Sequence, residues 1–206
     1  MRHLGAAPPR VVTCVGGVLS PLLGNVFLHY VLDLWFEQQV RPRLRGRAQL
    51  VRYADDFVMA FEDETDARRV FDVLPKRMAK FGLTLHPDKT RLLPMHRPRG
   101  QGRGKGAATF DFLGFTAYWR RAHGGTNWRV GLVTRKDRLR RAIVALDRYC
   151  RAERHRPVPE QRAGLARRLT GHFNYFGVQG NFSALAKVLY AAKRVWFKWL
   201  NRRSQR

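Results

Sequence analysis

Residues 50–61 read Leu50-Val51-Arg52-Tyr53-Ala54-Asp55-Asp56-Phe57-Val58-Met59-Ala60-Phe61. Two short β-prone runs flank two adjacent carboxylates, which predicts a β-hairpin with an acidic tip. Neighbouring side chains of a continuous strand face opposite ways, so Asp55 and Asp56 can serve one site only if the chain turns there. Two like charges this close repel unless a cation neutralises them, and hard carboxylate oxygens suit Mg2+. A solvated Asp-Asp turn is the plainer alternative. The apolar residues on both sides favour the metal site, because they indicate a buried hairpin.

Helices are predicted on both sides of this hairpin. Before it, Ser20 can cap a helix and Pro21 fits its first position. An apolar stripe at helical spacing follows, which we expect to face the core; it comprises Leu22, Leu23, Val26, Phe27, Tyr30, Val31, Leu34 and Trp35. Residues 21–38 and 65–81 are therefore predicted helices, and Pro75 is expected to bend or split the second one.

The charge is concentrated in the second half of the chain. The 206 residues hold 40 Lys and Arg against 15 Asp and Glu, a formal net charge of +25. Residues 1–96 hold 14 basic and 10 acidic residues (+4), whereas residues 97–206 hold 26 and 5 (+21). A Gly- and Arg-rich stretch at 97–106 cannot pack a core, so it predicts a basic linker close to a module boundary. The balance favours a polyanionic partner.

The second half also predicts a basic module of three helices. Three helical patterns carry it: Leu139, Ile143, Leu146 and Tyr149; then Leu165, Leu169, Phe173 and Phe176; then Leu185, Val188, Leu189, Ala192, Val195, Trp196 and Trp199. Aromatic residues among many Arg and Lys suit RNA backbone contact and base stacking, although core packing and solvated faces are the plainer alternatives. Neither a membrane span nor a secretory signal is indicated, and we expect an intracellular, cytoplasmic protein. Cys14 and Cys150 indicate neither a disulfide framework nor a zinc site.

Four ordered motifs resemble the palm of reverse transcriptases. Residues 53–56 resemble the Tyr-x-Asp-Asp box, and residues 16–23 resemble the loop-and-helix motif before it. Residues 83–90 are similar to the next palm motif, with Lys89 at its lysine, and residues 112–115 resemble the primer-grip hairpin. The resemblance implies an α+β fold, in which a partial right-hand palm of antiparallel strands and helices precedes an all-helical thumb.

The C-terminal part resembles the maturase-specific thumb domain of group II intron-encoded proteins. The similarity lies in residues 169–178, in Asn181-Phe182 and in residues 196–206. On this resemblance the chain divides into a non-matching segment (1–15), a partial palm with primer grip (16–119), a connecting strand and loop (120–137) and a helical thumb (138–206).

The resemblance implies RNA-templated DNA synthesis by two-metal phosphoryl transfer, with Mg2+ as the cofactor. RNA template, DNA primer and intron RNA would be the partners. Asp55 and Asp56 would be the catalytic metal ligands. The nucleotide and primer would contact Tyr53, Ala54, Gly16, Gly17, Lys89, Leu113 and Gly114. RNA would contact Arg138, Arg140, Arg141, Arg167, Arg168, His172, Asn174, Tyr175, Lys198, Arg202 and Arg203. For Lys89 a simple turn lysine is the alternative, and for the two glycines an ordinary turn.

Two departures from the family pattern limit what we expect of the chain alone. The family's further Asp on an earlier palm strand and its fingers have no counterpart here, and Asp33 and Glu37 fall in a predicted helix and are poor substitutes. Val15 stands where the family usually has Gln. Three hypotheses follow: a polymerase completed by another polypeptide that supplies fingers and palm, a non-catalytic RNA-binding maturase remnant, or a decayed reading frame whose product does not fold stably.

Overall fold

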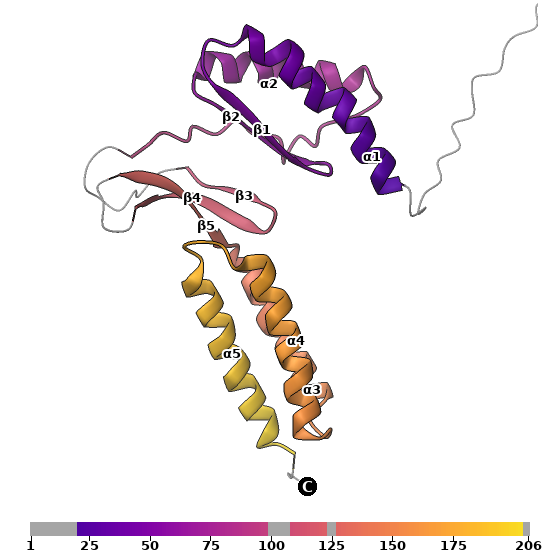
Figure 1. The fold of residues 1–206 in the computed structure, drawn as a ribbon, viewed down its shortest axis with the longest axis vertical. Helices are drawn as coiled ribbons and strands as arrows, with labels where there is room; N and C mark the ends of the chain where they lie inside the picture. Colours follow the sequence, from indigo (N-terminus) through magenta and orange to yellow (C-terminus); the bar gives the residue numbers. More distant parts are fainter. Residues whose placement is uncertain (1–19, 99–107, 123–126, 204–206) are drawn as a thin grey trace, which may run out of the picture. The chain divides into compact units, whose positions relative to one another are not determined.

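The structure is a computed structural model that describes residues 20–98, 108–122 and 127–203. The chain forms two compact units, Met1–Leu92 and Leu93–Arg206. In Figure 1 the described residues of the first unit are coloured from indigo to magenta, and the colours of the second unit end in yellow. Both units combine antiparallel strands with helices, so the predicted α+β class is confirmed. Most of the Gly- and Arg-rich stretch lies outside the described residues.

The first unit consists of a long helical segment, a hairpin and a second helix. Residues 20–40 are helical throughout, as α1 (Ser20–Leu28) followed by two π-helical turns, η1 (His29–Asp33) and η2 (Phe36–Val40). A 3-10 turn, η3 (Arg41–Arg43), ends this segment. The hairpin then follows as β1 (Ala48–Tyr53) and β2 (Asp56–Phe61), and the second helix is α2 (Glu64–Ala79). The predicted hairpin and the two predicted helices are confirmed.

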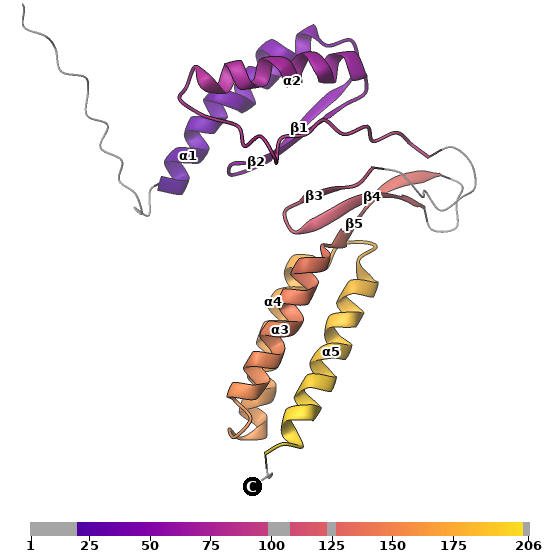
Figure 2. The ribbon, with the colours of Figure 1, turned by 180° about the vertical axis from the view of Figure 1, so that it is seen from behind.

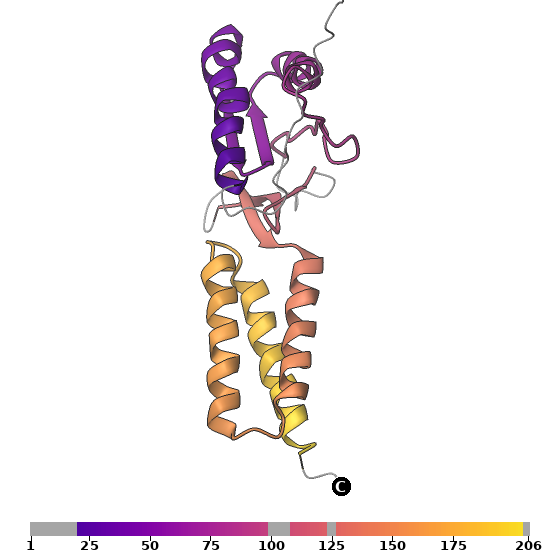
Figure 3. The ribbon, with the colours of Figure 1, turned by 90° about the vertical axis from the view of Figure 1, so that its right-hand side faces the viewer.

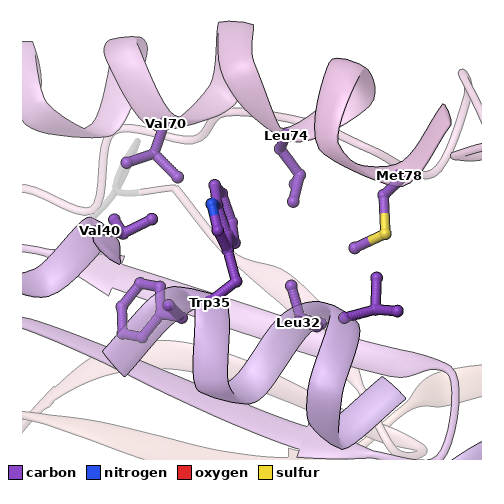
Figure 4. Close-up of a cluster of buried hydrophobic side chains, with 8 residues drawn as sticks. Leu32, Trp35, Val40, Val70, Leu74 and Met78 are labelled. Carbon is purple, nitrogen blue, oxygen red and sulfur yellow. The ribbon is translucent and has the colours of Figure 1, made fainter. Parts of the chain in front are cut away.

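The core of this unit lies between the helical segment, α2 and one face of the hairpin. Side chains from residues 32–40 and from α2 meet there, as Figure 4 shows for Leu32, Trp35, Val40, Val70, Leu74 and Met78. The α2 members recur every four positions and so form one stripe along that helix. The inward face of the hairpin completes the core with Ala48, Leu50, Phe57, Met59 and Phe61.

Only the last three of the eight residues of the predicted apolar stripe are buried or half-buried, so the expectation that the whole stripe faces the core is wrong. Val31 and Trp35 are buried, whereas the earlier members are 42–64 % exposed: Leu22, Leu23, Val26, Phe27 and Tyr30. The start of the helical segment is exposed because this segment is longer than the elements that pack on it. A helix over residues 20–40 is about 30 Å long, while a six-residue strand spans about 20 Å. Among the described residues, the hairpin and α2 therefore cover the helix from Val31 onward and leave the start of α1 uncovered.

Helix α2 continues through Pro75, so the expected split is also wrong. Proline removes one hydrogen bond to the carbonyl four residues earlier, which here belongs to Phe71. Both Pro75 and Phe71 are exposed, so water can bind the freed carbonyl. Leu74 and Met78 on either side are buried in the core, and this packing keeps the helix continuous.

The second unit joins a three-stranded sheet to three helices. The strands β3 (Phe110–Phe112), β4 (Phe115–Arg121) and β5 (Trp128–Thr134) pair antiparallel in that order. The helices are α3 (Lys136–Ala152), α4 (Val158–Phe176) and α5 (Phe182–Leu200), which lie side by side in Figure 3. Their shared core contains Leu146, Cys150, Leu165, Val188 and Ala192. The predicted three-helix module is confirmed, and Cys150 is a core residue.

Burial raises the pKa of the Cys150 thiol to about 11, so this cysteine stays protonated and unreactive at neutral pH. Of the helices in the described ranges, none combines the length and the apolar character that a membrane crossing needs.

A buried asparagine ties the sheet of the second unit to its helices. Figure 2 shows β5 running directly into α3, with α4 and α5 beside it. Asn181, which is fully buried before α5, accepts a hydrogen bond from the Thr134 backbone N–H at 2.9 Å. Its Nδ2 donates to Thr134 Oγ1 at 2.7 Å and to the Phe176 carbonyl at 2.8 Å. One side chain therefore joins the end of β5, the end of α4 and the start of α5.

We predict that Asn181→Ala lowers the free energy of unfolding of the second unit by about 3 kcal/mol, because it leaves the backbone N–H and the hydroxyl of the buried Thr134 without their partner and removes one hydrogen bond to the Phe176 carbonyl. Urea denaturation followed by helical circular dichroism measures this change. Asn174→Ala is the matched control, since Asn174 is exposed, and it should change the free energy by less than about 0.5 kcal/mol. Equal effects of the two substitutions would contradict the joining role of Asn181.

Candidate active site

The turn of the β1–β2 hairpin carries the two adjacent carboxylates. Tyr53 pairs with Asp56 across the strands, so the turn residues are Ala54 and Asp55, and Asp56 begins β2. Ala54 has φ +53°, a left-handed conformation that costs a residue with a Cβ about 1 kcal/mol. The turn therefore holds a backbone conformation that its surroundings must support.

Both carboxylates are exposed, so the expectation that apolar neighbours bury the hairpin is wrong for its tip. Side chains alternate along a strand, and in β1 only every second residue faces the helices. Tyr53 faces the other way and is 67 % exposed. A solvent-facing carboxylate pair suits a cation that takes its other ligands from water and phosphate groups.

Arg52 connects this turn to the long helical segment. Its Nε and Nη2 donate to the two carboxylate oxygens of Asp33 at 2.8 and 2.7 Å. Its Nη1 donates to Asn25 Oδ1 and to the Ala54 carbonyl, each at 2.9 Å. The hydrogen bonds from Arg52 lower the pKa of Asp33 from its ordinary value, outweighing the opposite effect of burial, and those to Asp33 raise the pKa of Arg52.

No third acidic or imidazole ligand joins Asp55 and Asp56 in the described part of the chain. There, no group of three or more His, Cys, Asp or Glu side chains could hold a metal ion. The two carboxylates that precede the hairpin have other partners, because Asp33 binds Arg52 and Glu37 accepts from Arg41 at 2.7 Å. The prediction that they are poor substitutes for a further metal ligand agrees with these contacts.

For the other predicted nucleotide-site residues of the first unit, the structure gives fewer contacts that define a role. Gly16 and Gly17 lie outside the described residues. Lys89 lies in a turn beyond α2, where its backbone N–H donates to the His86 carbonyl at 3.2 Å. Its side chain is exposed, which fits both a phosphate-binding lysine and a simple turn lysine. The hairpin alone brings Tyr53, Ala54, Asp55 and Asp56 together.

In the second unit, Leu113 and Gly114 form the tight turn between β3 and β4. Their φ angles are +48° and +79°, the sign pattern of a type I′ hairpin turn. The turn is held from outside, because the Tyr175 hydroxyl donates to the Leu113 carbonyl at 2.9 Å and the Arg135 backbone N–H donates to the Gly114 carbonyl at 3.0 Å. Phe115 stacks on the Tyr175 ring with centroids 6.0 Å apart. The predicted primer-grip turn is thus anchored on α4.

The predicted RNA-binding side chains divide into those with and those without protein partners among the described residues. Arg138, Arg140, Arg167 and Asn174 are exposed and have no side-chain hydrogen bond or ion pair there. The remaining residues make contacts within the unit. These are Arg141 with Asp137, Arg168 over the Tyr149 ring, His172 against Phe176, Tyr175 with Leu113, Lys198 with Asp147, Arg202 over the Trp199 ring, and Arg203 with the Arg156 carbonyl.

The family model described as reverse transcriptase (RNA-dependent DNA polymerase) matches residues 4–117. This range is more than half of the chain, and it contains both the carboxylate hairpin and the β3–β4 turn. The chain belongs to the reverse transcriptase family. The match also takes in residues 4–15, in which we found no resemblance. A comparison with curated proteins found no match.

Sequence reasoning missed the residues that support the reverse transcriptase hairpin. The sequence alone places Arg52 in a strand without a role, and it offers Asp33 only as a metal ligand. A signal was present: in a strand with Leu50 facing inward, Arg52 two positions later must face inward as well. A charged side chain on a buried face indicates an internal partner of opposite charge. The position of that partner on the preceding helix required the structure.

We predict that Asp33→Asn lowers the free energy of unfolding of the first unit by about 2 kcal/mol at pH 7, because it removes a charged acceptor from Arg52. The pKa of Asp33 is lower in the folded state, so its contribution is complete above the unfolded pKa near 3.9 and is lost as pH falls through the folded pKa. The difference between wild type and variant should therefore shrink from pH 5 towards pH 3.

Urea denaturation followed by the NMR signal of the Trp35 indole, which lies in the core of this unit, measures the difference. The control is Glu37→Gln, which removes only an exposed ion pair with Arg41 and should change the stability by less than about 0.5 kcal/mol at either pH. A pH-independent difference for Asp33→Asn would contradict the assigned ion pair.

Proposed function

We propose that this chain is the C-terminal part of a group II intron reverse transcriptase and maturase. Its functions would be RNA-templated DNA synthesis, as one part of the polymerase, and intron RNA binding that assists splicing. Two adjacent exposed carboxylates at the tip of a hairpin, separated from Tyr53 only by Ala54, are the observation that carries the proposal. The group II assignment rests on the resemblance of residues 169–178, 181–182 and 196–206 to a maturase thumb.

Asp55 and Asp56 are the residues that would hold Mg2+. The donor set fits this ion, which is commonly bound by one or two carboxylates together with water and substrate phosphates. The chemistry supplied by Mg2+ is activation of a primer 3′-hydroxyl and neutralisation of charge on the leaving pyrophosphate. The chain's own residues orient the ligands, because the β1–β2 register fixes where the two carboxylates emerge.

We propose further that the site is catalytically incomplete in this chain alone. Polymerases of this kind need a further carboxylate besides the adjacent pair, and the described residues offer none beside Asp55 and Asp56. Fingers and the first palm carboxylate would complete the site, either as part of a longer chain or on a second polypeptide.

A non-catalytic RNA-binding maturase remnant is the second candidate function. Its support is electrostatic, since residues 97–206 carry a net charge of +21. Several arginines of α3 and α4 also have no protein partner in the described residues, which leaves their guanidinium groups available to phosphates.

Primer extension on an RNA template tests the polymerase proposal. We predict Mg2+-dependent extension only when the chain is mixed with a separately expressed fingers-palm fragment of a related protein. Asp55→Asn or Asp56→Asn should abolish it, with a loss of at least about 100-fold, because each removes a charged metal ligand. Asp72→Asn is the matched control, since Asp72 is an exposed aspartate of α2.

The outcomes separate the hypotheses. Extension by the chain alone that needs Asp55 would mean that the further carboxylate lies within these residues, and the proposed incompleteness would be wrong. No extension in any mixture, with RNA binding intact, would leave the RNA-binding remnant as the function.

RNA binding as a function of salt tests the thumb. We predict that log Kd depends on log salt with a slope of about 0.7 to 0.9 per phosphate neutralised. Arg140→Ala and Arg167→Ala should each weaken binding and reduce that slope by roughly one phosphate. Arg68→Ala is the control, because Arg68 already pairs with Glu64 at 2.6 Å in the first unit. Salt-insensitive association would contradict RNA binding by the basic helices.

A further inference from the structure

The guanidinium of Arg52 is fully engaged inside the first unit. Its Nε and Nη2 bind both oxygens of Asp33, and its Nη1 binds the Asn25 side chain and the Ala54 carbonyl. A longer contact of 3.5 Å from Nη2 to the Asn25 carbonyl accounts for the fifth N–H. An arginine has five such donors, so every one of them has an acceptor within the unit.

These contacts join two elements that are far apart in sequence. Asn25 lies on α1, and Asp33 is the last residue of the π-helical turn η1. Ala54, by contrast, is the first turn residue of the hairpin. Arg52 therefore links the turn of Ala54 and Asp55 to a helix, and the planar fork of its guanidinium fixes the direction as well as the distance of that link.

Arg52 donates to the carbonyl of Ala54, the described turn residue of this hairpin whose backbone conformation is energetically unfavourable. Ala54 has a left-handed backbone, which residues with a Cβ adopt rarely. The two-residue loop of the hairpin requires this conformation, and the hydrogen bond to the Ala54 carbonyl supports it; loss of that bond would make rotation of Ala54 to negative φ easier. Such a rotation would change the direction in which Asp55 and Asp56 leave the turn.

Two other roles for Arg52 fit the geometry less well. Direct binding of a nucleic acid phosphate would need a free, accessible guanidinium, but the side chain is 13 % exposed and its donors are used. A purely stabilising ion pair would need only Asp33. The additional contact with the Ala54 carbonyl concerns the turn itself.

We propose that Arg52, held by Asp33 and Asn25, is a positioning residue that fixes the Ala54 conformation and thereby directs Asp55 and Asp56 towards a shared divalent cation. The assignment of cation binding to these two carboxylates rests on the proposed function. Arg52 itself touches neither the cation nor the substrate.

The test uses Mn2+ as the probe and the full chain, labelled with 15N. Bound Mn2+ broadens the amide signals of nearby residues, so a titration that follows residues 53–57 gives the affinity of the turn. The three-bond coupling between the amide and α protons of Ala54 reports its φ angle without any metal. The Trp35 indole signal shows whether the unit is folded.

Four variants accompany wild type. Arg52→Gln removes the guanidinium, and Arg52→Gln with Ala54→Gly adds a residue that adopts positive φ without cost. Arg47→Gln is the matched control on the same hairpin, since Arg47 forms an exposed ion pair with Glu62 at the other end. Asp55→Asn with Asp56→Asn removes the ligands.

We expect Arg52→Gln to weaken Mn2+ binding about tenfold, as loss of a supporting residue around metal ligands commonly does, and to change the Ala54 coupling. The added glycine should restore part of the affinity, and Arg47→Gln should match wild type. Rescue by glycine, in variants whose Trp35 signals both show a folded unit, separates positioning of the turn from a general loss of stability.

Specific broadening in wild type that is unchanged in Arg52→Gln would overturn the positioning role alone. So would weaker binding by an Arg52→Gln variant whose Trp35 signal shows a folded unit and whose affinity the added glycine does not restore. Equal broadening in wild type and in the variant lacking both carboxylates would overturn the metal site itself, and with it the role assigned to Arg52.

Discussion

The inward face of the β1–β2 hairpin packs on the helical segment of residues 20–40 and on α2, and the hairpin register follows from that packing. A slip by one residue would move Leu50 and Phe57 into solvent and Val51 into the core. The register in turn places Ala54 and Asp55 at the turn. Arg52 is the last inward position of β1, so the one charged side chain on that face meets the helical carboxylate Asp33. The packing that folds the unit therefore also positions its carboxylates.

Periodicity alone predicted much of this fold, and the failures share a cause. The hairpin, α2 and the three C-terminal helices follow from local apolar patterns, and all are present. The extent of burial along α1 depends instead on how far a partner element reaches, which no local pattern records. The same holds for Pro75, where distant core contacts of Leu74 and Met78 outweigh a local helix breaker. The exposed acidic pair was predicted to lie in a buried hairpin because apolar neighbours were counted without regard to the alternation of faces.

In the second unit, residue type alone did not distinguish side chains that could bind RNA from side chains that make contacts within the protein. His172 and Tyr175 were both predicted to contact RNA, yet the His172 ring packs on Phe176 and the Tyr175 hydroxyl holds the Leu113 carbonyl. Aromatic and basic side chains serve packing and RNA contact equally well by composition. The structure separates them by partner, and the exposed Arg140 and Arg167 remain the clearest candidates for phosphate contact.

Asp33 has a second effect on the site, because it neutralises the positive charge of Arg52 close to Asp55 and Asp56. An arginine next to two exposed carboxylates would ordinarily pair with them, because opposite charges at contact distance attract strongly where solvent is partly excluded. Such a pair would compete with any cation for the same oxygens. Asp33 and Asn25 prevent this competition by occupying the Arg52 donors on the helical side of the hairpin. The ion pair thus holds the turn. It also keeps the Arg52 guanidinium on β1 from pairing with the oxygens of Asp55 and Asp56, which is the condition that a divalent cation site at this turn requires.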